Sequence, residues 1–340
     1  MVGQKLVELL IDHPLLEIDV LAASDQSADK RYIDCIDWKS SKKLPLKIQN
    51  KIVSKCSPFF KTPLVFSALS SDVAYEIEKS FLEKGYHIIS NAKNFRLNSD
   101  VPLIIPEVNA SHIEMIELQK YPGKIITNPN CAVAGLALGL SPLFNHFGIE
   151  KLHVCTMQAI SGAGLHQLPE HLEKNIIPHI PQEEEKIETE PTKIFGQLSY
   201  GYVKPASFLI SAQCNRVPTL NGHFMNVSVK LSQKASLDEI KKAWIDFKSP
   251  ISQLPSAPLN PIQYFEKNDM PQPKINHSLG MHIGIGKLQT CFCLDFKFNL
   301  LVDNLIRGAA GAALLNAELF IERYPHLLSL SKTEICATLS

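Results

Sequence analysis

One cysteine of the chain stands where a reactive thiol is expected. Cys131 follows the segment Asn128-Pro129-Asn130 and precedes a small apolar run, Ala132 to Leu140. The pattern predicts that Cys131 lies in the first turn of a buried helix that follows a strand. Free backbone N–H groups and the helix dipole would favour the thiolate there, so we expect a lowered pKa and rapid alkylation near neutral pH. The alternative is an inert core thiol, the usual state of a free cysteine.

Two further segments could complete such a site. The loop from Cys214 to His223 offers Arg216, whose guanidinium could hold a carboxylate, and the His223 imidazole, which could transfer a proton. The segment from Gln158 to Gly164 places glycines after a predicted strand, where the backbone can approach a ligand and present amides to an anion. Taken singly, either segment is more often an ordinary turn.

The elements that must position these residues begin with a parallel sheet. Short apolar runs alternate with helical patterns up to residue 128, which is typical of a doubly wound α/β domain. We expect strands at Glu17 to Ala23, Leu64 to Leu69, His87 to Asn91, Leu103 to Pro106 and Ile125 to Thr127. Helical spacing predicts a crossover helix over Asp72 to Lys84, capped by Ser71 or Asp72 and ended by Gly85. Residues 1–128 are therefore predicted to form a Rossmann-like domain.

Longer alternating runs then predict a second, α+β domain over residues 129–302. Its strands, largely antiparallel, are expected at Leu152 to Ile160, Ser207 to Cys214, His223 to Leu231 and Thr290 to Leu300. Ser236 and Glu239 match a capping box ahead of a helix, and the stretch from Pro250 to Pro273 predicts an extended surface excursion. Asp303 would cap a long buried helix, and we expect the helical segment 303–340 to complete the first domain.

Composition excludes several classes of function. Lys and Arg together number 34, as do Asp and Glu, so the chain lacks the positive surplus typical of nucleic-acid binding. Its longest apolar stretches fall short of the ~20 residues of a membrane-spanning helix, and no signal-peptide pattern is present. We therefore expect a cytoplasmic protein with no nucleic-acid or membrane partner. The 8 cysteines show neither a disulfide framework nor a zinc-ligand set, so no metal is expected.

The segments around Cys131, Gln158 and Arg216 together resemble those of aspartate-semialdehyde dehydrogenases. Further matches are Ser90 to Asn109 and Asp303 to Glu318, and Glu183 to Pro191 is similar to the archaeal and fungal branch. The resemblance covers nearly the whole chain. It implies NADP-dependent reduction of L-4-aspartyl phosphate to L-aspartate 4-semialdehyde, through a cysteine thioester and with release of inorganic phosphate, in the biosynthesis of lysine, threonine and methionine. It also implies a homodimer or homotetramer with a catalytic and dimerisation domain.

The resemblance implies roles for individual residues. Cys131 would be the nucleophile, His223 the acid/base, and Gln158 would orient the thioester. The substrate-binding residues would be Arg216 for the α-carboxylate, Glu183 for the ammonium, and Arg96 with Lys186 for the phosphate, with Asn130 beside the substrate. The residues implied at the cofactor are Gly3, Ser24, Ser27, Ser161, Gly162 and Asn304.

The choice of cofactor depends on the residues after the first expected strand. Asp25 could accept the ribose hydroxyls of NAD, whereas the neighbouring serines and basic residues suit the extra phosphate of NADP. These residues alone leave the choice open, and the resemblance implies NADP.

The chain opens inside the phosphate-binding loop of that family. The family loop resembles G-A-T-G-x-V-G after a first strand, and this sequence begins at Met1-Val2-Gly3. We expect either a start ~15 residues upstream, a length set by one strand and its loop, or a damaged copy. A protein that starts at Met1 is expected to leave the edges of two neighbouring strands unpaired and to bind the cofactor poorly.

Two other functions stay open. N-acetyl-γ-glutamyl-phosphate reductase shares the fold plan and the thioester chemistry but takes an acylated amine, and Glu183 as a partner for a free ammonium argues against it. The other is a non-catalytic paralogue that pairs with an active dehydrogenase through the second sheet.

Overall fold

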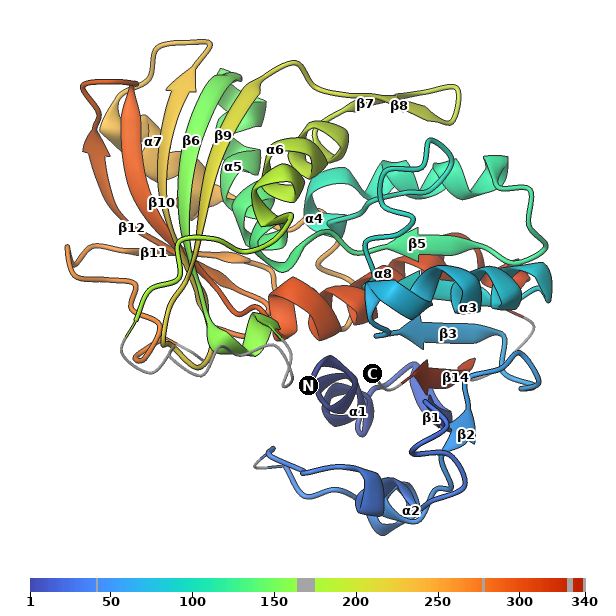
Figure 1. Ribbon diagram of the computed structural model, residues 1–340. Coiled ribbons are helices and arrows are strands. Elements are labelled where there is room, and N and C mark those ends of the chain that lie inside the picture. The colour runs from blue at the N-terminus through green and yellow to red at the C-terminus, as the bar shows by residue number, and fades with distance from the viewer. Residues whose placement is uncertain (41, 164–174, 277–278, 329–332, 339–340) are drawn as a thin grey trace.

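The computed structural model describes residues 1–40, 42–163, 175–276, 279–328 and 333–338. Two six-stranded sheets, each with its own helices, make up most of the protein (Figure 1). The first sheet is parallel and Rossmann-like and the second is mixed, so the predicted α/β class with a second α+β domain is confirmed. Gly164, part of the predicted glycine loop, lies outside the described residues.

The first sheet has the order β2-β1-β14-β3-β4-β5, and every pair is parallel. Its strands are β1 (Leu16–Ala23), β2 (Ser54–Lys55), β3 (Leu64–Ser67), β4 (His87–Ser90), β5 (Ile125–Thr127) and β14 (Thr333–Thr338). Helices that contact these strands include α1 (Val2–Leu10), α3 (Ser71–Glu83) and α8 (Gly311–Arg323). The predicted crossover helix is α3, although its N-cap is Ser70 and no side chain caps it.

One predicted strand of this domain is wrong. The run from Leu103 to Pro106 makes only an isolated bridge, from Leu103 to Thr127. Pro106 already begins helix α4 (Pro106–Asn109), because proline suits the first helical position, where its missing N–H costs no hydrogen bond.

The centre of the first sheet also differs from the expectation. β14 lies between β1 and β3 and pairs with both in parallel (Figure 1). The two edges that the sequence predicted to stay unpaired are therefore paired. A backbone ladder depends little on residue type, so a segment far away in the sequence can fill the position.

The buried helix predicted over Asp303 to Glu322 is present, but helix does not fill the segment 303–340 as expected. Asp303 Oδ1 accepts the backbone N–H groups of Leu305 and Ile306, so Asp303 caps the helical segment as expected. A π-helical turn, Ile306–Ala310, leads into α8, which ends at Arg323. A 3-10 turn, Pro325–Leu327, follows, and the segment 303–340 then ends in a strand and is not one continuous helix.

The second sheet has the order β11-β12-β13-β10-β6-β9. Its strands are β6 (Ile149–Gln158), β9 (Leu209–Arg216), β10 (His223–Leu231), β11 (Ile262–Phe265), β12 (Ile283–Thr290) and β13 (Phe296–Val302). The four central strands are antiparallel neighbours, whereas the outer pairs β6–β9 and β11–β12 are parallel. Two predictions need correction. β11 lies inside the proline-rich stretch expected on the surface, and a turn closed by Cys291 N–H to Asp295 O divides the run from Thr290 to Leu300.

Helix α5 (Cys131–Phe147) packs against the second sheet with its candidate nucleophile in the first turn. Two glycines of α5 permit this helix to approach β13 closely. A Cβ at Gly135 would lie 2.6 Å from Val302 Cβ, and one at Gly139 would lie 2.6 Å from Leu300 Cδ1. This packing fixes α5 on β13 and so fixes where its N-terminus lies.

The remaining elements are short or cover the sheets. They are η1 (Tyr32–Cys35), α2 (Leu46–Gln49), η2 (Ala110–Leu118), η3 (Ile160–Ala163), α6 (Glu183–Ile194), β7 (Gln197–Ser199), β8 (Tyr202–Lys204) and α7 (Leu237–Asp246). The predicted capping box of Ser236 and Glu239 does begin α7. Over the part of the chain that the structure describes, no helix is long and apolar enough to cross a membrane.

The position of β14 can be tested with one backbone substitution. Ile335 is in register with Ile18 of β1 and Leu64 of β3, and Ile335→Pro removes a donor from this central strand. We expect the melting temperature to fall by about 4 °C, from a loss of roughly 3 kcal/mol. Ile335→Val keeps the N–H and is the control. Equal melting temperatures of the two variants would show that β14 does not hold the sheet together.

Candidate active site

Cys131 is the first residue of α5, directly after the turn that follows β5. Asn130 caps the helix: its Oδ1 accepts the N–H groups of Ala132 at 2.9 Å and Val133 at 3.3 Å. The helix is buried from Ala132 to Leu143. The predicted placement of Cys131 in the first turn of a buried helix is therefore confirmed.

The His223 imidazole lies beside this thiol. His223 begins β10 and is fully buried, and its Nε2 is 3.1 Å from Cys131 Sγ. The backbone N–H of Ala159 donates to Nδ1 at 3.1 Å. A neutral imidazole carries one N–H, so this bond assigns the proton to Nε2, next to the sulfur. Burial, and then the nearby Arg216, lowers the pKa of His223 to about 3, so the ring is neutral near pH 7.

The thiol is not activated in the way the sequence predicted. Burial, and then the Glu183 carboxylate, raises the pKa of Cys131 to about 12, and three cations offset this only in part: Arg96, Arg216 and Lys186. The capping side chain already accepts the first free amides of the helix, so little of their attraction is left for the sulfur. The expected lowered pKa is therefore wrong for the free protein, in which the group is a thiol.

The carboxylate of Glu183 accepts hydrogen bonds from three polar side chains. Lys186 Nζ lies 2.6 Å from Oε1, while Asn130 Nδ2 and Gln158 Nε2 donate to Oε2 at 2.8 Å and 3.1 Å. Burial tends to raise the pKa of Glu183, but Lys186 and the two amides outweigh burial and lower the pKa. The carboxylate is therefore ionised near pH 7. Glu183 is only 8% exposed and Glu190 2%, so these two acids of α6 face the interior, whereas Glu185 is exposed.

Arg216, at the end of β9, is buried near Cys131 and His223. Its Nη1 donates to Ala159 O at 2.7 Å. The backbone of Gly162 lies against both Arg216 and His223. A Cβ at Gly162 would be 3.1 Å from Arg216 Nη1 and 2.9 Å from His223 Cε1. Glycine is required at this position because a side chain would displace both groups.

Arg96 reaches the site from the loop after β4. The side chain is 7% exposed, and its Nη1 lies 2.8 Å from Glu190 Oε1. Both cations that the sequence assigned to phosphate are thus paired with a carboxylate of α6, Arg96 with Glu190 and Lys186 with Glu183.

A cavity of about 600 Å³ lies between α1, the end of β1 and the loop after β6. Of the predicted cofactor residues, those that line it are Gly3, Ser24, Ser27 and Ser161. Asn304 lies behind Ser161: its Nδ2 donates to Ser161 Oγ at 2.9 Å, and its Oδ1 accepts the Gly222 N–H at 2.9 Å. Gly162 instead lies against His223 and Arg216. The structure therefore groups four of the six predicted cofactor residues around one cavity.

Three residues of the site were missed by the sequence analysis. A Cβ at Gly308, in the π-helical turn, would lie 2.7 Å from Cys131 Cβ, so Gly308 packs directly on Cys131. Ala159 acts through its backbone N–H, for which the sequence carries no signal. Glu190 lies two helical turns after Glu183, and this spacing could have indicated that the two acids share one face of α6.

Comparisons with known proteins agree with this architecture. The family model "Semialdehyde dehydrogenase, NAD binding domain" matches residues 1–116, and "Semialdehyde dehydrogenase, dimerisation domain" matches residues 140–307. The aspartate-semialdehyde dehydrogenase of Methanothermobacter thermautotrophicus is 39% identical over 335 residues, which cover 95% of this chain and 96% of the relative. That of Saccharomyces cerevisiae is 40% identical over 347 residues, 95% of each chain.

Solved structures are similar over the same extent. Aspartate-semialdehyde dehydrogenase with NADP from Candida albicans has a TM-score of 0.87 at 38% identity and covers 94% of this chain and 95% of its own. Aspartate semialdehyde dehydrogenase II from Vibrio cholerae, complexed with ASA, has a TM-score of 0.77 at 22% identity, covering 95% and 96%. The second likeness supports the fold alone.

The raised pKa of Cys131 leads to a labelling prediction. The backbone N–H of Leu294 lowers the pKa of Cys291, so iodoacetamide should modify Cys291 before Cys131 at pH 7. The rate at Cys131 should rise about tenfold per pH unit as the thiolate forms. Peptide mass spectrometry over a pH series measures both rates. Fast labelling of Cys131 at pH 7 would show that the free protein already holds a thiolate.

Proposed function

This chain belongs to the aspartate-semialdehyde dehydrogenase family, so it is an oxidoreductase that interconverts L-4-aspartyl phosphate and L-aspartate 4-semialdehyde, and we propose how its residues divide that reaction. The observation that carries the proposal is the 3.1 Å contact between Cys131 Sγ and His223 Nε2. The charges of Arg96, Lys186, Arg216 and Glu183 all act on this pair. These charges match a substrate with two anionic groups and one ammonium.

Cys131 is the nucleophile. Its sulfur attacks the acyl carbon of the aspartyl phosphate, and the carbon–oxygen bond to phosphate breaks as the thioester forms. The thiol proton departs with the phosphate, which is released as hydrogen phosphate. This proton path suits a thiol whose pKa is raised, because no free thiolate has to exist beforehand.

His223 serves as a fixed hydrogen-bond donor in place of the acid/base that the sequence predicted. When bound, NADPH supplies the hydride that reduces the thioester. The Nε2–H would then donate to the oxyanion or to the sulfur. As the carbon–sulfur bond breaks, the oxyanion becomes the aldehyde carbonyl and Cys131 leaves as a thiolate, which regains its proton from solvent, so the ring itself transfers no proton. The low pKa of His223 and the Ala159 N–H at Nδ1 both support a ring that stays neutral.

The substrate is held by residues on both sides of the thiol. Arg216 binds the α-carboxylate, Glu183 accepts the ammonium, and Gln158 orients the thioester. Lys186 and Arg96 bind the phosphate. Each of these two cations already has a carboxylate partner, so the phosphate shares the cation with that partner.

NADP is the cofactor, and the cavity beside β1 fits it. Its lining includes the hydroxyls of Ser24 and Ser27, which suit phosphate groups. Lys5 and Lys39 also line it, each paired with a carboxylate of the same lining, Glu8 and Asp37, so a phosphate would share these cations. Asp25, the residue that could favour NAD, does not line the cavity, and its carboxylate lies 3.4 Å from Lys55 Nζ. Ser161, held by Asn304, lies where the cavity approaches the catalytic pair.

A homodimer or homotetramer built on the second sheet completes the proposal. The dimerisation-domain model spans this sheet. Alternate residues of β10, such as Met225 and Val227, pack in the core, while Phe224 of β10 and Met157 of β6 are partly exposed on the sheet. The cytoplasmic location and the lack of a nucleic-acid partner stay predictions.

The kinetic roles of Arg216 and His223 should separate. Arg216→Lys loses the two-pronged contact to the α-carboxylate and should raise KM for the semialdehyde about tenfold or more, with a smaller change in kcat. His223→Ala should lower kcat by about a hundredfold or more. His223→Gln, whose amide can still donate, should recover part of kcat. Equal losses in the Ala and Gln variants would contradict the donor role.

Substrate choice tests the reaction itself. Because the ionised Glu183 suits a free ammonium, we expect turnover of aspartate semialdehyde with NADP and phosphate, and none of N-acetyl-glutamate semialdehyde. The assay follows NADPH formation with each aldehyde. Turnover of the acetylated aldehyde alone would replace the proposal with the reductase, and no turnover of either would favour a non-catalytic paralogue.

A further inference from the structure

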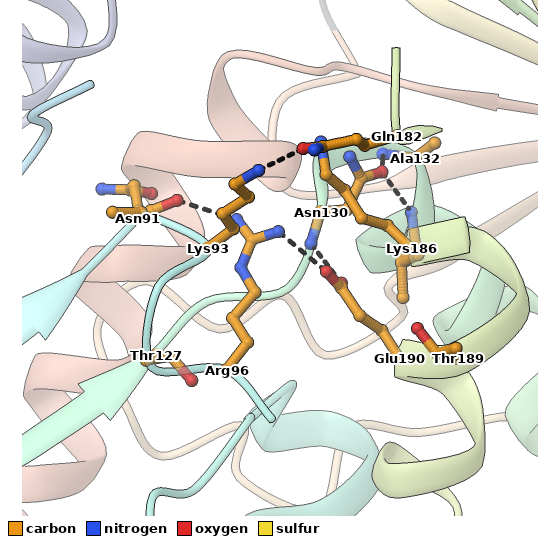
Figure 2. A network of polar contacts seen from close by, with 12 residues as sticks. Asn91, Lys93, Arg96, Thr127, Asn130, Ala132, Gln182, Lys186, Thr189 and Glu190 are labelled. Atoms are coloured by element: carbon orange, nitrogen blue, oxygen red, sulfur yellow. Dashed lines mark hydrogen bonds and ion pairs between the residues drawn. The ribbon is translucent and has the colours of Figure 1, made fainter. Parts of the chain in front are cut away.

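The carboxylate of Glu190 joins two parts of the site that are far apart in the sequence. Its Oε1 accepts from Arg96 Nη1 at 2.8 Å, and its Oε2 accepts the backbone N–H of Asn130 at 2.6 Å. Figure 2 shows Glu190 on α6 between the Arg96 guanidinium and the Asn130 backbone. The side chain is 2% exposed, so water does not compete for either bond. One buried group thus sets the distance between a cation and the residue that precedes the nucleophile.

The guanidinium of Arg96 keeps donors for a ligand despite these contacts. Of its five N–H groups, Nη1 uses one toward Glu190, and Nη2 uses one toward Asn91 O at 2.7 Å. Arg96 Nε is buried and has no partner among the described residues. The two contacts hold the plane of the guanidinium at both terminal nitrogens and leave the other N–H groups for an anion.

The backbone of the same loop is held separately. Lys193, one helical turn after Glu190, donates from Nζ to the carbonyl oxygens of Arg96, Asn98 and Val101, each at 2.7 Å. None of these three bonds uses Glu190, although burial lowers the pKa of Lys193 and the Glu190 carboxylate offsets this in part, which favours the charged donor. A change at Glu190 should release the Arg96 side chain while its backbone stays in place.

We propose that Glu190 is a positioning residue that aims Arg96 at the phosphate group and ties it to the turn that carries Cys131. This inference rests on the proposed role of Arg96 in phosphate binding. A single carboxylate accepts from both partners at once, so the cation and the nucleophile turn are held in one geometry before substrate arrives.

The test is Glu190→Gln, assayed in the direction that consumes phosphate. Glutamine has one acceptor oxygen, and its NH2 group would face a donor on either Arg96 or Asn130, so one of the two contacts is lost. We expect KM for inorganic phosphate to rise about tenfold or more, while KM for NADP changes less than about twofold. Glu188→Gln is the matched control: Glu188 lies on the same helix and accepts a backbone N–H, that of Ala212, at 2.9 Å. It should leave KM for phosphate and KM for NADP near those of the parent.

A double-mutant cycle separates this inference from the function on which it rests. If Arg96→Lys leaves KM for phosphate unchanged, the proposed role of Arg96 is wrong. If Arg96→Lys raises it and Glu190→Gln does not, only the positioning role is wrong. If Glu190 acts through Arg96, Glu190→Gln should add little to the phosphate KM of Arg96→Lys. Full additivity in the double variant would overturn the proposal.

A second substitution covers the case in which Glu190→Gln does not fold, as judged by thermal melting. Glu190→Asp keeps the charge and both acceptor oxygens but is shorter by one methylene. It should fold and raise KM for phosphate, because it cannot reach Arg96 and Asn130 together. A parental phosphate KM in Glu190→Asp would contradict the positioning role.

Discussion

The side chain of Asn130 is the contact on which the rest of the site depends. Its Oδ1 accepts the first amides of α5 and so fixes the turn that presents Cys131, while its Nδ2 donates to Glu183. An amide can accept and donate from one position, whereas aspartate would repel Glu183 and serine has too short a reach. Because the Asn130 backbone N–H also binds Glu190, this residue sets the nucleophile relative to both buried acids of α6.

Burial then decides the charge state of the whole site. In a low-dielectric environment an unpaired charge is costly, and breaking a buried pair costs about 3–5 kcal/mol. The structure follows this rule, since Glu183 pairs with Lys186 and Glu190 with Arg96. The thiol and the imidazole have no such compensation, so burial shifts the pKa of each toward its neutral form. A phosphate bound by Arg96 and Lys186 would therefore share each cation with its carboxylate.

Pairing of backbone groups in the first sheet and close packing on the second sheet together position the two halves of the site. The parallel sheet needs a central strand to satisfy the backbone groups of β1 and β3, and β14 supplies it. This keeps the end of β1, with its serines, beside α1 and the cofactor cavity. The second sheet fixes α5 through the close approach at Gly135 and Gly139. The loop with Ser161 and Gly162 joins the two, because Ser161 lines the cavity and Gly162 lies against His223 and Arg216.

The sequence by itself determined the features that depend on local pattern. Apolar periodicity predicted most strands of both sheets and the helix that begins at Cys131. The spacing of Ser236 and Glu239 predicted the capping box of α7. Only the tertiary structure decided the features that depend on contacts between groups distant in the sequence. The raised pKa of Cys131 comes from burial and from Glu183, and the tautomer of His223 is set by the Ala159 backbone. The buried carboxylate of Glu190 is paired with Arg96, which lies far away in the sequence. The strand at the centre of the first sheet is of the same kind, because a backbone ladder accepts almost any sequence and so leaves no local pattern to find.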